Sequence, residues 1–298
     1  MKICLVIVTY NRVNTLMTTL QYIKEQTVKA DYIIVVNNGS KDETESRVNN
    51  FALFKIYPLH MKENMGFGYG LSMGMKYGLK QFNDIDFFLL MDDDSHPDKE
   101  LLPKLLHARQ IIGKPGIVCS IGYVDYLWKG PVSIYKDSNK KKRNISIEPS
   151  IYSVDHVLVD GALIDKAVVD KIGTLREDVF MMCEDAEYSK RIKRAGYSIS
   201  VLEDAQMMNR LHMGGGDRFS FSTRWRGYYH ARNHLMILKE YFSVRSLFIY
   251  LIRQTKYLLA GLMAPDRMDR SRLRLFGIYH GLIGKMGKTI DPETYPHN

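Results

Sequence analysis

The first third of the chain alternates between short apolar runs and segments with helical spacing, and this alternation restricts the possible fold more than any other feature. The runs "KICLVIVTY", "DYIIVVNNGS", "FKIYPLHM" and "DIDFFLLMD" are typical of buried strands. Between them, "NRVNTLMTTLQYIKEQ", "KDETESRVNNF" and "GYGLSMGMKYGLKQF" have the spacing of helices. Strands rich in Val, Ile and Leu that alternate with helices predict an α/β fold, with a mostly parallel sheet flanked by helices.

The remainder of the chain predicts a second, helical region. Strand-like runs continue as far as "YSISVLEDAQMMNR", and from about Arg224 the sequence is helical to the end, with a break at Pro265. We therefore expect one domain over residues 1–234 and a helical region over residues 235–298. The formal net charge of +9 is unevenly spread, because the stretch from Lys239 to Lys288 holds ten Lys or Arg against three acidic residues. Nucleic acid, an anionic membrane surface or a phosphate-bearing substrate would each match such an excess.

The cysteines exclude a small domain stabilised by disulfides and one stabilised by zinc. Cys4, Cys119 and Cys183 are odd in number and far apart, so they form neither a disulfide framework nor a zinc-binding pattern. We expect a reducing compartment. The N-terminal "MKICLVIVTYNR" is interpreted as the first buried strand, since a signal peptide needs a longer apolar region and a small-residue cleavage site.

Three consecutive aspartates close the fourth apolar run, in "FFLLMDDDSHP". Side chains alternate along a strand, so we expect Asp92 and Asp94 on one side and Asp93 on the other. Two carboxylates at a strand end offer hard oxygen ligands, which suit Mn²⁺ or Mg²⁺ and leave positions open for phosphate oxygens. The alternative is a solvated turn that caps the helix after Pro97.

Polar residues also follow the first two strands, at the edge where parallel sheets bind their ligands. Thr9, Asn37 and Ser40 can meet a base and a ribose, and Arg12 can meet a phosphate. The stretch "ENMGFGYGLSMG" holds glycines that allow a backbone to approach a ligand closely. It lacks the G-x-G-x-x-G spacing and does not follow the first strand, so a dinucleotide-binding dehydrogenase is not favoured.

The second half of the chain adds further candidates for the site. Glu184 and Asp185 stand at a helix start, where acids either pair with the helix dipole or act as a general base. His212 follows a strand in "RLHMGGG" and is either a metal ligand or a surface histidine. Arg224, Arg226 and Arg232, in "RWRGYYHARNH", either clamp a diphosphate or form a basic helix face.

Taken in order, the motifs "VTYNR", "VVNNGSKD", "NMGFGYG", "MDDDSHP", "EDAEYSKRI" and "YYHARN" resemble those of inverting GT-A glycosyltransferases of family 2. The resemblance covers about Met1 to His234. The triple aspartate, the E-D-x-E-Y run and the later histidine look most like the galactofuranosyltransferases, whereas rhamnosyltransferases more often show a single aspartate near the metal. The resemblance implies a GT-A fold with a helical C-terminal extension, and an enzyme that takes its sugar from a nucleotide-sugar donor.

The resemblance also implies what individual residues do. Asp92 and Asp94, completed by His212, would bind Mn²⁺ or Mg²⁺ on the donor's diphosphate. Asp185 would be the catalytic base, with Glu184 beside it. The other residues expected to bind the nucleotide sugar are Thr9, Arg12, Asn37, Ser40, Asn64, Gly66, Asp93 and Arg232.

One departure from the family pattern concerns the nucleotide. Family members usually carry Asp where this chain has Asn37, and Asn presents both a donor and an acceptor of hydrogen bonds. UDP-galactofuranose is the expected donor, with dTDP-rhamnose as the alternative. Two other classes stay open: a nucleotidyltransferase, whose usual basic Gly-rich loop after the first strand is missing here, and a non-catalytic basic membrane-binding protein.

The C-terminal region predicts contact with a membrane surface. The run "RMDRSRLRLFGIYHGLIGKMGK" places Leu273, Phe276 and Tyr279 at helical spacing beside Arg270 and Arg274. The run "LFIYLIRQTKYLLAGLMAP" is too short and too interrupted by charges to span a bilayer. We expect a cytoplasmic protein, peripheral at the inner face of the cell membrane, with a lipid-linked glycan as acceptor. The alternative is packing on the catalytic domain or on another subunit of a homo-oligomer; nucleic acid is not an expected partner.

Overall fold

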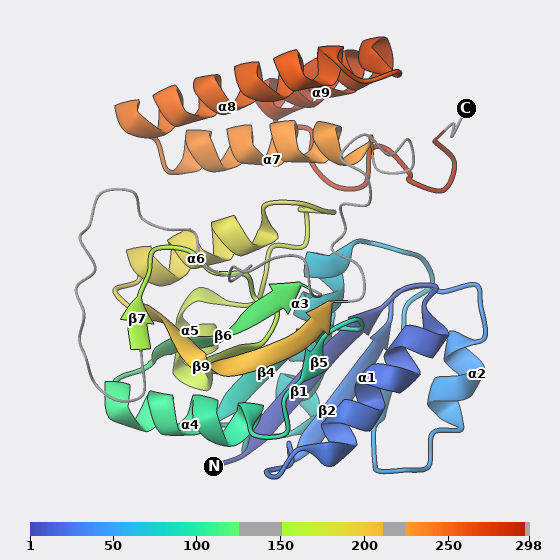
Figure 1. Ribbon diagram of the computed structural model, residues 1–298, viewed down its shortest axis with the longest axis vertical. Coiled ribbons are helices and arrows are strands. Elements are labelled where there is room, and N and C mark those ends of the chain that lie inside the picture. Colours follow the sequence, from blue (N-terminus) through green and yellow to red (C-terminus); the bar gives the residue numbers. More distant parts are fainter. Residues whose placement is uncertain (125–150, 211–223, 296–298) are drawn as a thin grey trace.

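The computed structural model describes residues 1–124, 151–210 and 224–295. Within these residues it confirms the α/β class, since a nine-stranded sheet carries helices on both faces (Figure 1). The sheet has the order β3-β2-β1-β4-β8-β6-β9-β5, and β7 pairs with β9 outside this path. The strands are β1 Ile3–Thr9, β2 Tyr32–Asn37, β3 Tyr57–His60, β4 Phe87–Asp92, β5 His96–Pro97, β6 Gly116–Val124, β7 Ile151–Ser153, β8 Ala162–Asp165 and β9 Ser198–Arg210.

The helices alternate with the strands in the first half of the chain and follow one another at its end. They are α1 Val13–Glu25, α2 Thr44–Asn49, α3 Phe67–Gln81, α4 Leu101–Ile112, α5 Lys166–Ile172, α6 Glu184–Arg194, α7 Arg226–Glu240, α8 Val244–Leu262 and α9 Arg267–Ile283.

Strands β1 to β4 form the parallel part of the sheet. Strand β1 pairs in parallel with β2 and β4, and β2 with β3. Strand β8 runs antiparallel to both of its neighbours, β4 and β6, whereas β6 and β9 are again parallel. The sheet is therefore mostly parallel but mixed, as the continuous apolar runs predict.

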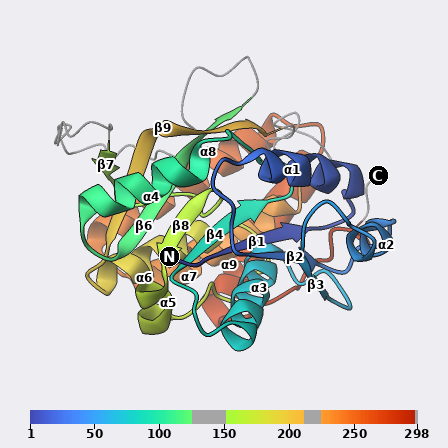
Figure 2. The same ribbon diagram turned by 90° about the horizontal axis from the view of Figure 1, so that it is seen from below.

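Each face of the sheet has its own core. Along β1, Val6 and Val8 face the core that α3, α5 and α6 cover. Leu5 and Ile7 point the other way, into the core beneath α1 and α4. Figure 2 shows these two groups of helices on opposite sides of the sheet. Alternating directions along a strand that is covered on both faces explain why the run is apolar at every position.

The glycines of α3 bring this helix close to β1. A Cβ atom added at Gly74 would lie 2.4 Å from Cγ1 of Val6, and one added at Gly70 would lie 2.7 Å from Cγ1 of Val8. Glycine costs a helix about 1 kcal/mol relative to alanine, so the close approach has to be worth that cost. The N-terminal end of α3 consequently lies at the sheet edge where β1, β2 and β4 end.

Helices α7, α8 and α9 form a separate layer at one end of the molecule. Helix α7 lies nearer to the sheet than α8 and α9 (Figure 1). Helix α9 packs tightly on α7, because a Cβ atom added at Gly277 would lie 2.3 Å from the carbonyl oxygen of Tyr228. The boundary expected after residue 234 falls inside α7, and the division into two domains stays a prediction. Among the described residues, no helix combines the length and the apolar character that crossing a bilayer requires.

Candidate active site

The polar strand ends predicted to meet do meet at one edge of the sheet. In the parallel register Thr9 pairs with Asn37, and Val8, the residue before Thr9, pairs with Asp92. The carboxyl ends of β1, β2 and β4 are therefore side by side, where open α/β sheets bind their ligands.

The three consecutive aspartates gather their carboxylates at this edge. Asp92, Asp93 and Asp94 each offer an oxygen, and these oxygens lie within 4.8 Å of one another. The expectation that Asp93 points away from the other two is wrong. Strand β4 ends at Asp92, and a turn follows; side chains alternate only where the backbone stays extended.

A fourth aspartate, which the sequence analysis missed, supports this turn. Asp160 accepts hydrogen bonds from the amide of Asp92 (3.0 Å) and the hydroxyl of Ser95 (2.6 Å). Thr19, on α1, donates to the carbonyl of Asp93 at 2.6 Å. Neither contact has a local sequence signal, since Asp160 and Thr19 are more than sixty residues from the turn.

One arginine partly neutralises the aspartates. Nη1 of Arg12 lies 3.0 Å from Oδ1 of Asp93 and 2.9 Å from Oδ2 of Asp94. Thr9 donates its hydroxyl to Oδ2 of Asp93 at 2.7 Å. Burial raises the pKa of Asp93 to about 6, although Arg12 and Thr9 favour its charged form.

The charge balance of the aspartate triad fits a divalent cation. Loss of solvent, followed by the charges of Asp93, Asp94 and Asp160, raises the pKa of Asp92 well above its ordinary value. Oδ1 of Asp94 is buried and has no hydrogen-bond partner among the described residues. Buried carboxylates with spare oxygens are what Mn²⁺ and Mg²⁺ bind, and a cation removes the repulsion between like charges.

The end of β2 is held by its own turn. Asn37 is buried, and its Oδ1 accepts from the amide of Ser40 at 3.0 Å, while its Nδ2 lies 3.3 Å from Nδ1 of His60. The hydroxyl of Ser40 accepts from the amide of Asn11, joining this turn to the one after β1. Asn37 and Ser40 thus lie at the predicted edge of the sheet. Asn11, from the motif "TYNR" after β1, lies there too.

Asn38 connects this edge to the start of α3, and the sequence analysis missed it. Its Nδ2 donates to the carbonyl of Gly66 (3.1 Å) and to Oδ1 of Asn64 (3.2 Å). Oδ1 of Asn64 also accepts from the amide of Gly66 at 2.9 Å. The three residues belong to two motifs that the sequence shows, "NNGS" and "NMGFGYG". The sequence does not show that the two motifs are joined by hydrogen bonds.

Gly66 allows a close approach to backbone. It has φ +99°, and a Cβ atom there would lie 1.7 Å from the carbonyl oxygen of Phe180. A Cβ atom at Gly68 would lie 3.2 Å from Cβ of Glu184. The start of α3 therefore touches the segment that leads into α6 and lies next to Glu184.

Helix α6 begins with the two predicted acids after an unusual turn. Met182 and Cys183 both have φ +70°, a conformation that is strained in residues other than glycine. Glu184 is buried, and this burial, with the charge of Asp185, raises its pKa to about 8. Asp185 is half-buried and accepts from the amide of Val159 at 2.9 Å.

Two adjacent residues link α6 to the aspartate triad. Val159 holds Asp185, and the next residue, Asp160, holds Asp92. Asp185 and the triad thus border the same short segment of chain. This is the pair of carboxylate sites that the sequence motifs predicted, and the segment that joins them is a finding of the structure.

The chain also matches a known family. Glycosyl transferase family 2 matches residues 4–172, more than half of the chain. This chain is a member of glycosyl transferase family 2. The match ends before Glu184 and Asp185, so their functions are not part of it.

The glycosyltransferase is similar to curated relatives and to solved structures. A galactofuranosyltransferase of Mycolicibacterium smegmatis is 27% identical over 231 residues, which cover 73% of this chain and 72% of that protein. A dTDP-rhamnosyl transferase of Shigella flexneri is 22% identical over 305 residues, which cover 94% of this chain and 96% of that protein. The structure of a Pyrobaculum calidifontis mannosyltransferase, in complex with GDP-Man and Mn²⁺, has a TM-score of 0.56 and 14% identity, covering 95% of this chain and 88% of that chain. These likenesses confirm the GT-A fold.

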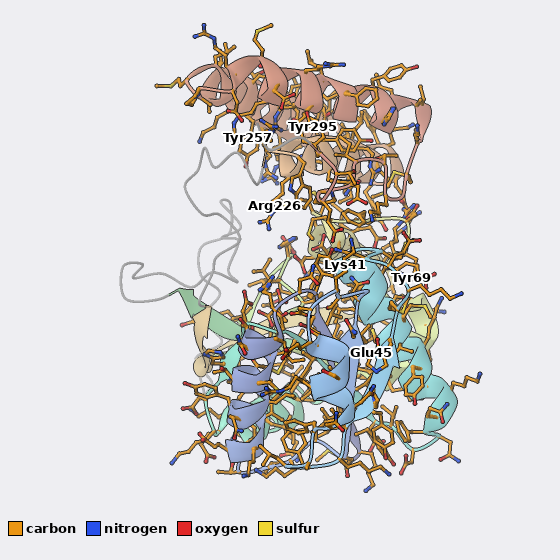
Figure 3. The ribbon with its side chains drawn as sticks, turned by 90° about the vertical axis from the view of Figure 1, so that its right-hand side faces the viewer. Lys41, Glu45, Tyr69, Arg226, Tyr257 and Tyr295 are labelled. Atoms are coloured by element: carbon orange, nitrogen blue, oxygen red, sulfur yellow. The ribbon has the colours of Figure 1, made fainter. Side chains whose placement is uncertain are left out.

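The two arginines of α7 have different surroundings in the glycosyltransferase. Arg226 points from the start of α7 toward the sheet (Figure 3). Burial lowers the pKa of Arg226, as does Arg12, whereas Glu184 and Asp92 oppose this shift, so all three groups lie near its guanidinium. The site therefore has a second arginine that can face a phosphate.

Arg232 does not join the site, and its predicted contact with the donor is not supported. Its side chain is fully buried; Nη1 donates to the carbonyl of Gly287 (2.7 Å) and to the hydroxyl of Thr289 (3.0 Å). Its guanidinium lies 4.8 Å from the ring centre of Tyr229. One helical turn and a half separates it from Arg226, which places it on the side of α7 that holds the C-terminal segment. His212 lies outside the described residues.

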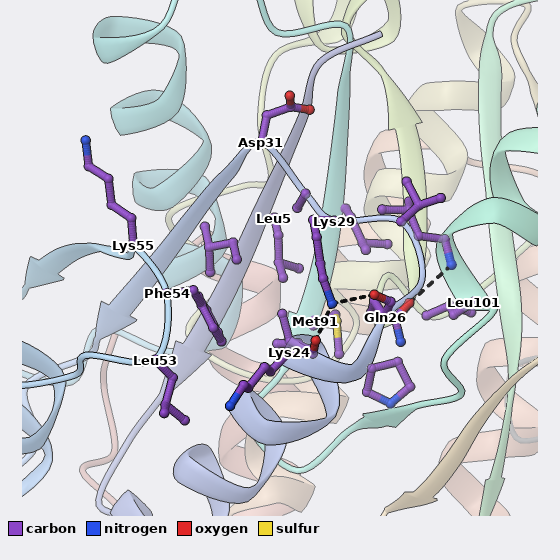
Figure 4. Close-up of a pocket in the computed structure, with 17 residues that line it drawn as sticks. Leu5, Lys24, Gln26, Lys29, Asp31, Leu53, Phe54, Lys55, Met91 and Leu101 are labelled. Atoms are coloured by element: carbon purple, nitrogen blue, oxygen red, sulfur yellow. Dashed lines mark hydrogen bonds between the residues drawn. The ribbon is translucent and has the colours of Figure 1, made fainter.

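A separate cavity of about 300 Å³ lies between the C-terminal end of α1 and the start of α4 (Figure 4). Leu5, Phe54 and Met91 are among the apolar side chains that line it. The amine of Lys29 donates to the carbonyls of Lys24 and Gln26 at its edge. None of the residues that line this cavity is a predicted site residue, so it has no part in the catalytic edge.

Proposed function

We propose that this glycosyltransferase moves galactofuranose from UDP-galactofuranose to a hydroxyl of a lipid-linked glycan, with inversion at the anomeric carbon and with a divalent cation. The observation that carries the proposal is the link from the aspartate triad to Asp185 through Val159 and Asp160. It supports the proposal because the triad, which would hold the cation, and Asp185, which would act as the base, border one short segment and can both reach one bound sugar.

The base in this proposal is Asp185. It removes the proton from the acceptor hydroxyl as the oxygen attacks the anomeric carbon, from the side opposite to the departing diphosphate. Glu184, whose pKa is about 8, stays protonated near neutral pH and adds no second negative charge at the start of α6. A single charged carboxylate is then available to accept the proton.

The departing diphosphate needs positive charge around it. Asp92 and Asp94 would hold Mn²⁺ or Mg²⁺, which stabilises charge on the leaving phosphate oxygens when bound. Arg12, half-exposed beside the triad, and Arg226 from α7 add two guanidinium groups near the same place. Thr9, Asn37, Ser40 and Asn64 line the adjoining strand ends, where the nucleoside would bind.

The donor follows from the relatives and stays a proposal. Galactofuranosyl and dTDP-rhamnosyl transferases are both among the similar proteins, and solved structures of similar fold contain GDP-Man or UDP-GlcNAc. Asn37, whose amide is already engaged with Ser40 and His60, does not favour one pyrimidine over the other. The dTDP-rhamnosyl relative covers 94% of the chain, and rhamnose is therefore the second candidate.

A donor comparison tests the proposal. The protein is incubated with a lipid-linked glycan acceptor and with UDP-galactofuranose, dTDP-rhamnose or UDP-GlcNAc, in Mn²⁺, in Mg²⁺ or in excess EDTA, and release of the nucleoside diphosphate is recorded. We expect the fastest release from UDP-galactofuranose, loss of activity in EDTA, and recovery on adding Mn²⁺. Full activity in EDTA would contradict the need for a divalent cation. Selective release of nucleoside diphosphate from dTDP-rhamnose would contradict galactofuranose as the transferred sugar.

A further inference from the structure

Exposed apolar side chains gather on the outer helical layer. Among the described residues, sixteen of the nineteen exposed large hydrophobic side chains lie between Phe242 and Ile283. Phe248 is 61% exposed, Ile252 66% and Leu259 59%. Monomeric soluble proteins rarely expose a contiguous apolar surface of this kind, which usually marks a binding surface.

On α8 the exposed apolar residues form one stripe. Tyr250 and Gln254 are the buried residues of this helix, and Tyr250 contacts His234 of α7. The exposed residues recur at three- and four-residue spacing on the opposite side, so they face away from α7. The stripe consists of Val244, Phe248, Leu251, Ile252, Leu259 and Leu262; Ile249 and Tyr257 are the other exposed large apolar residues of this helix.

Helix α9 repeats this arrangement. Its buried residues Gly277 and Gly281 lie against the backbone of α7, at Tyr228 and Arg232. The exposed stripe lies on the other side and consists of Met268, Leu275, Phe276, Tyr279, Leu282 and Ile283. Helices α8 and α9 both lie on the side of α7 that is remote from the sheet (Figures 1 and 3), so the two stripes form one outward surface, here called the α8–α9 face.

The helical layer also contains a basic pocket. It has a volume of about 260 Å³, and its charged lining is entirely cationic: Arg224, Arg226, Lys256, Arg270 and Arg274. The pocket lies between the start of α7, the end of α8 and the start of α9.

The arginines of the pocket have different partners. Arg224 pairs with Asp269 at 3.0 Å, and Arg270 with Asp266 at 2.6 Å. The contacts of Arg274 are neutral: Nη1 donates to Gln254 at 2.8 Å, and the guanidinium lies 4.6 Å from the ring centre of Tyr257. An anion in the pocket would complete the pairing.

We propose that the α8–α9 face docks on a lipid bilayer that contains anionic phospholipids, with the headgroup phosphate of one lipid in the basic pocket. The apolar stripes then lie at the level of the upper acyl chains, and the arginines meet phosphate, as in helices that lie in a membrane interface. This docking is independent of which sugar the enzyme transfers.

Charge favours a bilayer over a second copy of the chain. Between Val244 and Lys285 the sequence holds eight Lys or Arg against two acidic residues. A two-fold contact through the α8–α9 face would bring two such surfaces together, and like charges would repel. An anionic bilayer removes this repulsion and covers the apolar stripes at the same time.

Sedimentation with vesicles tests the docking. Phosphatidylcholine vesicles with and without phosphatidylglycerol are compared, using the wild type and the double variant Phe248→Glu/Leu259→Glu. We expect the wild type to sediment with the anionic vesicles, and added salt to weaken this binding. The double variant should bind about tenfold more weakly or worse, because two apolar side chains no longer enter the interface. Equal binding of the wild type and the double variant would overturn the proposal.

Two controls separate docking from folding and from catalysis. Leu53→Glu changes an exposed apolar residue that is far from α8 and α9, and it should bind vesicles as the wild type does. Lys256→Gln, exposed at the rim of the pocket, should lower binding to anionic vesicles and leave binding to neutral vesicles unchanged. All variants should keep the cation-dependent release of nucleoside diphosphate from the donor in detergent-free buffer, which shows that they are folded.

Light scattering without vesicles tests the alternative, a dimer formed through the α8–α9 face. We expect a wild-type monomer, or an association that the double variant does not change. A dimer that the double variant dissociates would identify the α8–α9 face as a subunit interface and overturn the proposal.

Discussion

Two regions of this glycosyltransferase reverse the usual distribution of polar and apolar groups, and they do so in opposite senses. At the sheet edge, Asp93 and Asp94 are 1% and 3% exposed, although Asp is almost never buried without a partner. On α8 and α9, by contrast, large apolar side chains point into solvent. The first region is fixed by hydrogen bonds from distant segments. In the second, α8 and α9 are packed only on the side that faces α7. In our two proposals, the buried charge of the first region binds a small charged ligand, and the exposed apolar surface of the second binds an extended surface.

The strongest test of the polar region is Asp185→Asn. Loss of the general base should lower sugar transfer by about 10²–10⁴-fold, while donor affinity stays near the wild-type value. Transfer rates and calorimetric titration with the donor measure the two effects. Asp170→Asn, which removes a surface partner of Lys166, should leave both unchanged. Undiminished transfer by Asp185→Asn would remove the base from the proposed mechanism.

The triad itself is tested by Asp94→Ala. This change removes one buried ligand oxygen, so donor affinity in Mn²⁺ should fall by at least about tenfold. In EDTA the variant and the wild type should bind the donor equally weakly. If calorimetry gave the same affinity in Mn²⁺ for both proteins, Asp94 would have no part in binding a cation.

The inner side of the helical layer is tested by Gly277→Ala. An added Cβ atom would lie 2.3 Å from the carbonyl oxygen of Tyr228, so α9 must move away from α7 and the free energy of unfolding should fall by about 2 kcal/mol. Urea unfolding measures the change. Gly261→Ala is a matched control on α8, because its Cβ atom would meet nothing nearer than 3.8 Å. The control should be neutral or slightly stabilising. Equal stability of the two variants would show that the helical layer is loosely packed on both sides.

The smallest expected effect concerns pH and Glu184. Burial raises the pKa of Glu184 in the folded protein to about 8, above the ordinary value of 4.5. The protonated form stabilises the fold fully below pH 4.5, and this contribution is lost as the pH rises through 8. Glu184→Gln removes the titration, so its stability relative to the wild type should improve between pH 5.5 and pH 7 by on the order of 1–2 kcal/mol. Urea unfolding at several pH values measures this difference; a constant difference would contradict the buried, protonated Glu184.

Sequence reasoning located the strands and the strand-end motifs because both depend on local periodicity. The run that contains Val6 and Val8 is continuously apolar over the length of one strand, and this pattern alone predicts a buried strand. It did not identify Asp160 or Asn38, since each acts through a partner on a different segment. It also placed Arg232 at the donor, because a helix start with several arginines does not reveal which side meets the sheet. Arg226 and Arg232 lie on different sides of α7. Arg232 faces the C-terminal segment because α9 packs on that side of α7.

The junction of Val159 and Asp160 sets a fixed length within the enzyme. One peptide unit separates the group that hydrogen-bonds Asp185 from the group that hydrogen-bonds Asp92, so in the proposed mechanism the spacing between base and cation site is set within one short segment. Inserting a single residue there should shift Asp185 relative to Asp92, although neither side chain is itself changed.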